Sequence, residues 1–141
     1  MRNSWHKSVL MADDDAEDCM LASDALTASG AGAAFSCVLD GIELMEYLSK
    51  HARSEAKQLP DLILLDLNMP RKDGREALVE IKSEPALRHI PVVILTTSDE
   101  QRDADFTRKA GAESFITKPA TFEEWVEIME SLAGSWLEKV G

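Results

Sequence analysis

Polar side chains follow four short apolar runs of the sequence, and they carry the groups that phosphate chemistry needs. The residues concerned are Asp13, Asp14, Asp15, Asp66, Thr96 and Lys118. Carboxylates brought together without a cation repel one another, which raises their pKa values. A Mg²⁺ ion relieves that repulsion, because it binds one or two carboxylates and leaves a position for a phosphate oxygen. The set therefore predicts a magnesium site that also receives a phosphoryl group.

Phosphoryl transfer is the reaction that such a pocket favours. A metal ion, the Lys118 ammonium and the Thr96 hydroxyl would together stabilise the charge that spreads over the transferring group. A carboxylate can itself be the nucleophile and form an aspartyl phosphate. Each residue alone has an ordinary structural explanation, since acids favour helix N-termini and Lys-Pro is a common turn. Their order at the ends of successive apolar runs is what favours a functional site.

These residues need a sheet that brings the ends of several strands to one edge. Short apolar runs alternate with amphipathic helical segments five times, and the expected strands are residues 8–12, 34–39, 62–65, 92–95 and 114–117. Several helix starts carry capping signals, at Asp40–Glu43, Asp73–Glu76, Ser98–Gln101 and Thr121–Glu124. The runs are continuously apolar, which indicates strands covered on both faces. We therefore expect an α/β fold, a doubly wound five-stranded parallel sheet with helices on both faces, whose ligand binds at the carboxyl ends of the strands.

Composition excludes several classes of protein. The chain has 141 residues and a formal net charge of −11, which fits one domain that repels polyanions. Non-specific binding to DNA or to anionic lipid is therefore not expected. No run reaches the ~18 apolar residues of a membrane span, and residues 1–7 lack the apolar segment of a signal peptide. We expect a cytoplasmic protein that binds neither nucleic acid nor membrane.

The two cysteines, Cys19 and Cys37, are too few for a disulfide framework. Cys37 lies in an apolar stretch and Cys19 in a helical pattern. In a reducing cytosol both are expected to be free thiols that are buried or half-buried.

Four motifs together resemble the receiver domain of two-component response regulators. They are residues 9–15, residues 62–70 with Asp73-Gly74, residues 91–96 and residues 117–119. The resemblance covers about residues 7–133, and it implies a CheY-like fold in which Asp66 accepts a phosphoryl group from a phosphohistidine of a histidine kinase. Residues 1–141 would then form a single receiver domain, in which 134–141 extend the last helix and no output domain follows. Signalling would proceed by protein–protein contact.

The resemblance also implies a set of metal ligands. Asp14 and Asp66 would bind Mg²⁺ directly, together with the backbone carbonyl of Asn68. Asp13 would act through a bound water molecule.

The remaining site residues carry implied roles as well. Thr96 would donate its hydroxyl to a phosphate oxygen, and Lys118 would pair with the phosphate. Phe115 occupies the position of the family's switch aromatic, usually Tyr or Phe, although a plain core-edge Phe is an equal alternative. A cis peptide between Lys118 and Pro119 would help to aim the ammonium into the site.

A narrower resemblance concerns the partner. Residues 52–59, 68–76, 95–98 and 135–137 are similar to stand-alone receivers that partner phytochrome-type histidine kinases. The resemblance implies a histidine kinase as phosphoryl donor, with a phytochrome as the candidate.

Three other readings compete with this one. A haloacid-dehalogenase-like phosphatase would want a second Asp two residues after Asp66, where this chain has Asn68. A flavodoxin-like FMN binder would want a hydroxyl- and Gly-rich loop in place of the acids 13–15. A degenerate receiver that binds partners without phosphorylation is the third, and a Mg²⁺-dependent labelling test on Asp66→Asn would separate all of them.

The apolar series of the last helix runs on through Trp136, Leu137 and Val140, past the end of the expected core near Ala133. Trp136 and Leu137 are then expected to be exposed, and exposed apolar clusters commonly mark interfaces. We expect a two-fold homodimer built on the last helix, with help from the fourth helix and fifth strand. A tail that folds back onto its own domain is the alternative.

Overall fold

A computed structural model describes residues 7–54 and 58–137 of the chain. The strands in these residues are β1 Lys7–Ala12, β2 Ala33–Val38, β3 Leu62–Leu65, β4 Val92–Thr96 and β5 Ser114–Thr117. The α-helices are α1 Ala16–Ala28, α2 Gly41–Arg53, α3 Gly74–Ser83, α4 Gln101–Ala110 and α5 Phe122–Leu132. A π-helical turn, Ala133–Leu137, continues α5. None of the described helices combines the length and the apolar character needed to cross a lipid bilayer.

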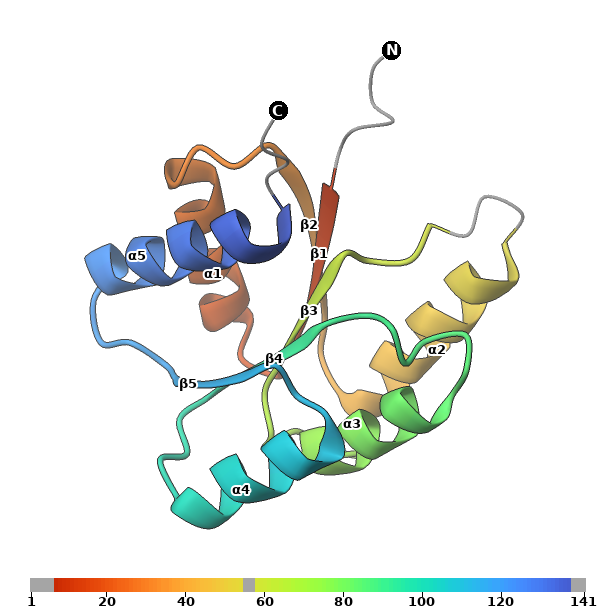
Figure 1. Ribbon diagram of the computed structural model, residues 1–141. Helices are drawn as coiled ribbons and strands as arrows, with labels where there is room; N and C mark the ends of the chain where they lie inside the picture. The colour runs from red at the N-terminus through yellow and green to blue at the C-terminus, as the bar shows by residue number, and fades with distance from the viewer. Residues whose placement is uncertain (1–6, 55–57, 138–141) are drawn as a thin grey trace.

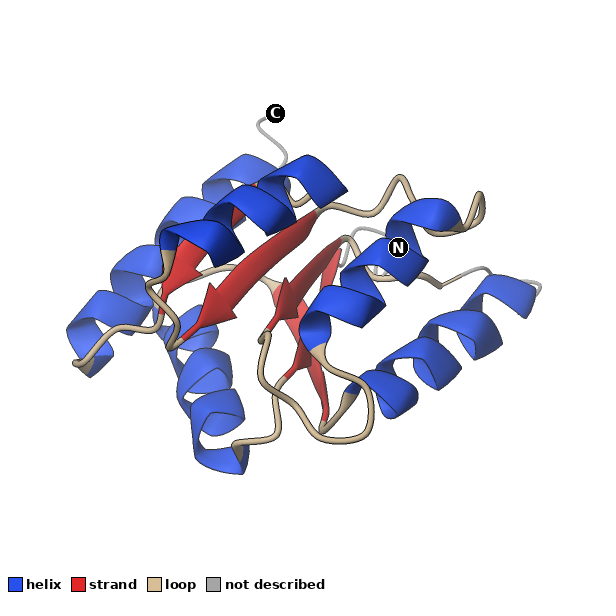
Figure 2. Cartoon of the chain, turned by 90° about the horizontal axis from the view of Figure 1, so that it is seen from below, coloured by secondary structure: helices blue, strands red, loops and turns tan. Residues whose placement is uncertain are grey.

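The strands form one parallel sheet in the order β2-β1-β3-β4-β5. Helices α1 and α5 cover one face, and α2, α3 and α4 cover the other, as Figure 1 shows. Figure 2 shows the same three layers in a second view. The strand order reverses at β1, which pairs with β2 on one side and β3 on the other. The doubly wound fold predicted from the sequence is confirmed.

Two apolar clusters, one on each face of the sheet, explain why these segments form their elements. All four residues of β3 are buried, and they alternate between the two clusters. All five residues of β4 are buried as well. Strand β2 differs, because it lies at the sheet edge and alternates between half-buried and exposed residues before the buried Val38. The central strands β3 and β4 are therefore buried throughout, and the edge strands β2 and β5 are not.

Helix capping agrees with the sequence at three starts and disagrees at a fourth. Asp40 caps α2 by accepting a hydrogen bond from the Glu43 N–H at 2.9 Å. Asp73 and Glu76 form the predicted reciprocal capping box of α3, as do Thr121 and Glu124 in α5. The expectation that Ser98 caps α4 is wrong. The helix begins after Glu100 without a side-chain cap. Ser98 lies two residues before this N-cap, where its hydroxyl donates to the Asp103 carboxylate at 2.7 Å and accepts from the Glu100 N–H at 3.3 Å.

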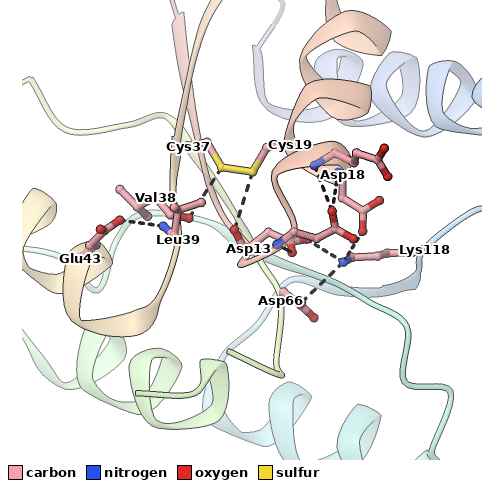
Figure 3. Close-up of a disulfide and its surroundings, with 11 residues drawn as sticks. Asp13, Asp18, Cys19, Cys37, Val38, Leu39, Glu43, Asp66 and Lys118 are labelled. Carbon is pink, nitrogen blue, oxygen red and sulfur yellow. Dashed lines mark hydrogen bonds and ion pairs between the residues drawn. A yellow bond between two sulfur atoms is a disulfide. The ribbon is translucent and has the colours of Figure 1, made fainter. Parts of the chain in front are cut away.

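The expectation of free thiols is also wrong, because Cys19 and Cys37 form a disulfide. Cys19 lies early in α1, and Cys37 lies one residue before the end of β2. Since α1 packs against the sheet beside β2, the two Cα atoms are 6.4 Å apart, which is within the range of natural disulfides. Figure 3 shows the bond beside the end of β1.

The end of the chain corrects a third expectation. Leu137 is buried, and Trp136 is half-buried against the cluster formed by α1, α5 and the sheet. The premise that both side chains are exposed is therefore wrong, because the π-helical turn folds them back onto their own domain. Val140 lies outside the described residues.

Candidate functional site

Backbone pairing brings the predicted site residues to one edge of the sheet. The Asp66 N–H donates to the Ala12 carbonyl at 3.0 Å, so Asp66 lies beside the residue that follows Ala12, which is Asp13. The Lys118 N–H donates to the Thr96 carbonyl at 2.7 Å in the same way. Each bond extends a strand ladder by one residue. The acids, the hydroxyl residue and the lysine therefore gather at the carboxyl ends of adjacent strands, as predicted.

Three carboxylates form a cluster suited to a cation. Asp13, Asp14 and Asp66 each offer an oxygen, and these oxygens lie within 4.8 Å of one another. Asp13 and Asp66 are buried, and Asp14 is exposed. The Asp66 Oδ1 atom is buried and has no hydrogen-bond partner among the described residues. A buried carboxylate oxygen without a partner is costly, and a hard oxygen-seeking cation such as Mg²⁺ or Mn²⁺ fits this donor set.

Lys118 provides the positive charge in the pocket (Figure 3). Its side chain is 8% exposed, and its Nζ atom lies 2.7 Å from Asp13 Oδ2 and 2.7 Å from Asp18 Oδ2. The Nζ atom is 3.5 Å from Asp66 Oδ2. Burial lowers the pKa of Lys118, but the hydrogen bonds to Asp13 and Asp18 outweigh burial and raise it above its usual value. Lys118 is therefore firmly protonated.

Burial acts in the opposite direction on Asp13. It raises the pKa of the Asp13 carboxyl to about 6, and the nearby Asp66 charge adds to the rise. The hydrogen bonds from Lys118 and from the Asp15 N–H lower the pKa without cancelling the effect of burial. Without a cation, the ionised form of Asp13 is therefore costly to the fold.

Because ionised Asp13 is costly to the fold, the stability of the protein depends on pH. The folded-state pKa lies above the unfolded value of about 3.9, so the folded protein binds the proton more tightly. The stability tied to protonated Asp13 is full below about pH 4 and is lost as the pH rises through about 6. We expect the free energy of unfolding of Asp13→Asn, relative to the unmodified protein, to increase by on the order of 2 kcal/mol from pH 4 to pH 7.

Urea titrations in metal-free buffer at several pH values measure this difference. Asp24→Asn, at an exposed position of α1, is the matched control and should show little pH-dependent difference. A difference for Asp13→Asn that stays constant from pH 4 to pH 7 would contradict the prediction.

The remaining predicted residues lie around the acids. Thr96 is fully buried at the end of β4. Asn68 is exposed two residues after Asp66. Phe115 in β5 is half-buried, packs against one apolar cluster and lines a hollow of 180 Å³ between α4 and β5. The carbonyl role of Asn68 and the switch roles of Thr96 and Phe115 remain predictions.

The loop between β3 and α3 is held close over Asp66. The Gly74 N–H donates to the Leu67 carbonyl at 2.8 Å, and a Cβ atom at Gly74 would collide with the Asp66 backbone. Arg71, with a φ of 68°, donates from Nε to the Asp40 carboxylate at 2.8 Å. These contacts fix the path of the chain immediately after Asp66.

The expected cis peptide before Pro119 is absent, since the described residues contain no cis bond. The trans form is the lower-energy isomer of an X–Pro bond. With it, the backbone of Lys118 still bonds to Thr96, and the ammonium still reaches Asp13. A cis bond is therefore not needed to aim the lysine.

The sequence did not predict two carboxylates that hold polar side chains in and beside the site. Asp18 binds Lys118 from a position 100 residues away, and in sequence it looks like an ordinary first-turn acid of α1. The buried Asp103 accepts two hydrogen bonds from Arg75 at 3.0 Å and one from Ser98. These bonds, the Ser98 bond foremost, keep the pKa of Asp103 below its usual value. Local sequence carries no signal for either contact.

Comparison with known proteins identifies the family. The response regulator receiver domain profile matches residues 9–130. The chain belongs to this family. The receiver is 35% identical to the response regulator Rcp1 of Synechocystis sp. over 134 residues, which are 95% of this chain and 91% of Rcp1.

Solved structures agree with the sequence match. The crystal structure of the phosphorylated cyanobacterial phytochrome response regulator RcpA has a TM-score of 0.84 and 38% identity, over 96% of this receiver and 97% of RcpA. The Mn²⁺-bound form of Rcp1 has a TM-score of 0.83 and 35% identity, over 96% and 97% of the two chains. The receiver is therefore a phosphoacceptor signalling protein, and the phosphatase and flavodoxin-like readings are excluded.

Proposed function

We propose that Asp66 accepts a phosphoryl group from the phosphohistidine of a histidine kinase, in a Mg²⁺-dependent reaction, and that the phosphorylated receiver signals by protein–protein contact. The observation that carries the proposal is the position of Asp66. It is buried in a cluster with two other carboxylates, has an oxygen without a hydrogen-bond partner in the part of the chain that the structure describes, and lies 3.5 Å from the Lys118 ammonium.

The transfer forms one bond to phosphorus and breaks another. A carboxylate oxygen of Asp66 forms a bond to phosphorus, and the bond from phosphorus to the histidine nitrogen of the donor breaks. The proposed ligands of Mg²⁺ are Asp14, Asp66 and the Asn68 carbonyl, with Asp13 acting through water. The bound cation would neutralise charge on the phosphoryl oxygens. Thr96 and Lys118 are proposed to hold the transferred group through its hydroxyl and ammonium.

Mapping of the phosphorylated residue tests this proposal. The receiver is incubated with acetyl phosphate and Mg²⁺, the acyl phosphate is trapped by borohydride reduction, and the labelled residue is found by mass spectrometry. We expect one labelled residue, Asp66, and no label when EDTA removes the cation. A protein that takes up no label would favour the degenerate receiver, and a label on another residue would contradict the assignment of Asp66.

The partner is proposed to be a histidine kinase of the phytochrome type, acting with this receiver in the cytoplasm. The support is the similarity to RcpA, which is described as a phytochrome response regulator. Phosphotransfer profiling against the kinases of the host would test this assignment. Faster transfer from a kinase without a phytochrome sensor would contradict it.

We also propose that the receiver forms a homodimer through α5, α4 and β5, and that this dimer takes part in signalling. Phe106 in α4 and Phe122 at the start of α5 are each 44% exposed, and Phe115 lies in β5 between these helices. Contiguous exposed apolar patches commonly mark interfaces, and these two side chains are the proposed anchors of such a patch. Phosphorylation would bias the dimer through Thr96 and Phe115, since β4 and β5 are neighbours in the sheet.

Sedimentation velocity of the unmodified protein and of Phe106→Ser with Phe122→Ser measures the dimer. We expect the double variant to dimerise at least tenfold more weakly. Trp136→Ala, in the half-buried turn after α5, tests whether Trp136 contributes to the dimer, as its place in the apolar series of the sequence suggested. A monomeric unmodified protein at high concentration, or a double variant that dimerises as well as the original, would contradict the proposal.

A further inference from the structure

We propose that Asp18 is a positioning residue for Lys118. Its carboxylate holds the ammonium aside from Asp66, which keeps the Asp66 carboxylate free to receive a cation and a phosphoryl group. The inference rests on the proposed function, because Asp66 is the proposed acceptor.

The contacts of the ammonium carry the inference. Lys118 Nζ lies at hydrogen-bonding distance, 2.7 Å, from Asp18 Oδ2, but 3.5 Å from Asp66 Oδ2. Asp13 Oδ2 lies at the same distance, 2.7 Å, from Nζ. The two short contacts thus leave Asp66 outside hydrogen-bonding distance. If Asp18 lost its charge, the Asp66 carboxylate, 3.5 Å away, would be the next anionic partner of the ammonium after Asp13.

Asp18 is itself held in place from two sides (Figure 3). The Asp15 carboxylate caps α1 and accepts hydrogen bonds from the Glu17 and Asp18 N–H groups. The next residue, Cys19, is bonded to Cys37 in β2. The Asp18 side chain is 20% exposed, so its pairing with Lys118 is partly shielded from solvent. A side chain on such a fixed turn can set the position of its partner.

The ordinary explanation of Asp18 is different. Acidic residues in the first turn of a helix are favoured by the helix dipole without any contact. Glu17 satisfies that preference from an exposed position in the same turn, and no contact joins it to Lys118 within the described residues. Glu17→Gln is therefore a matched control that removes one charge from the same turn.

Affinity for Mn²⁺, measured by calorimetry without any phosphoryl donor, is the deciding readout. We expect Asp18→Asn to weaken Mn²⁺ binding by about threefold to tenfold, because the released ammonium competes with the cation for Asp66. Glu17→Gln should weaken it by less than about twofold. Asp18→Glu, which keeps the charge, should stay within about twofold of the unmodified protein.

A double-mutant cycle separates positioning from simple loss of charge. In a Lys118→Met background no ammonium can move onto Asp66, so the effect of Asp18→Asn should fall to that of Glu17→Gln. Unchanged Mn²⁺ affinity in Asp18→Asn, or the same loss with and without Lys118, would overturn the role of Asp18. Phosphorylation of the unmodified protein is tested separately. Its absence would refute the proposed function, while the Mn²⁺ cycle would still decide the role of Asp18.

Discussion

Replacing Asp66 by asparagine is expected to reduce phosphorylation by at least about 1,000-fold, to a level that cannot be detected. The amide has nearly the same shape as the carboxylate, but it is a poor nucleophile at neutral pH. It also removes one negative charge from the cluster that Asp66 forms with Asp13 and Asp14. The variant therefore loses both the atom that attacks phosphorus and part of the cation affinity.

Labelling with acetyl phosphate at saturating Mg²⁺ checks this expectation. Asp24→Asn, on the exposed side of α1, is the matched control and should label as well as the unmodified protein. Circular dichroism of both variants establishes that they are folded. Persistent labelling of Asp66→Asn would contradict the role of Asp66, unless mass spectrometry placed the phosphoryl group on Asp13 or Asp14.

Removing the disulfide between Cys19 and Cys37 is expected to lower the free energy of unfolding by about 3 kcal/mol. The bond closes a loop with a sequence separation of 18 residues, which restricts the unfolded chain and so disfavours unfolding. A loss of this size corresponds to a fall in melting temperature of roughly 10 °C for a domain of this length.

Urea unfolding of the oxidised protein and of Cys19→Ser with Cys37→Ser measures the difference. Addition of a reductant should destabilise the unmodified protein to the same extent and should leave the double variant unchanged. Equal stability of the oxidised and reduced protein would contradict the prediction.

The part of the site that lies at strand ends could be predicted from the sequence. The sequence of a buried parallel strand is a continuous apolar run, and residues 62–65 of β3 and 92–95 of β4 are such runs. The residue after each run is then fixed at the carboxyl edge of the sheet, which is why Asp66 and Thr96 were found. Hydrogen bonds between adjacent strand ends bear this out.

The part that depends on packing between distant elements could not be predicted. Asp18 meets Lys118 only because the first turn of α1 comes within reach of the side chain that follows β5 in the folded protein. The disulfide likewise depends on how closely α1 approaches β2. In both cases the local pattern, an acid in a first turn or a cysteine on a helix, is the same with or without the contact.

The same limit applies to the end of the chain. Helical spacing correctly placed Trp136 and Leu137 on the continuing apolar stripe of α5. It did not specify that a π-helical turn would direct Leu137 into the core, because that depends on packing against the apolar cluster on this face of the sheet.

The close approach of Gly74 to Asp66 has an evolutionary consequence. Any side chain at position 74 would collide with the backbone of Asp66 and Leu67, and any side chain at Gly41 would collide with Lys72. Neither glycine bears a group that takes part in chemistry, yet each leaves selection almost no alternative amino acid. Substitutions around this pocket are therefore restricted at the two glycines, where a Cβ atom would not fit, as well as at the carboxylates.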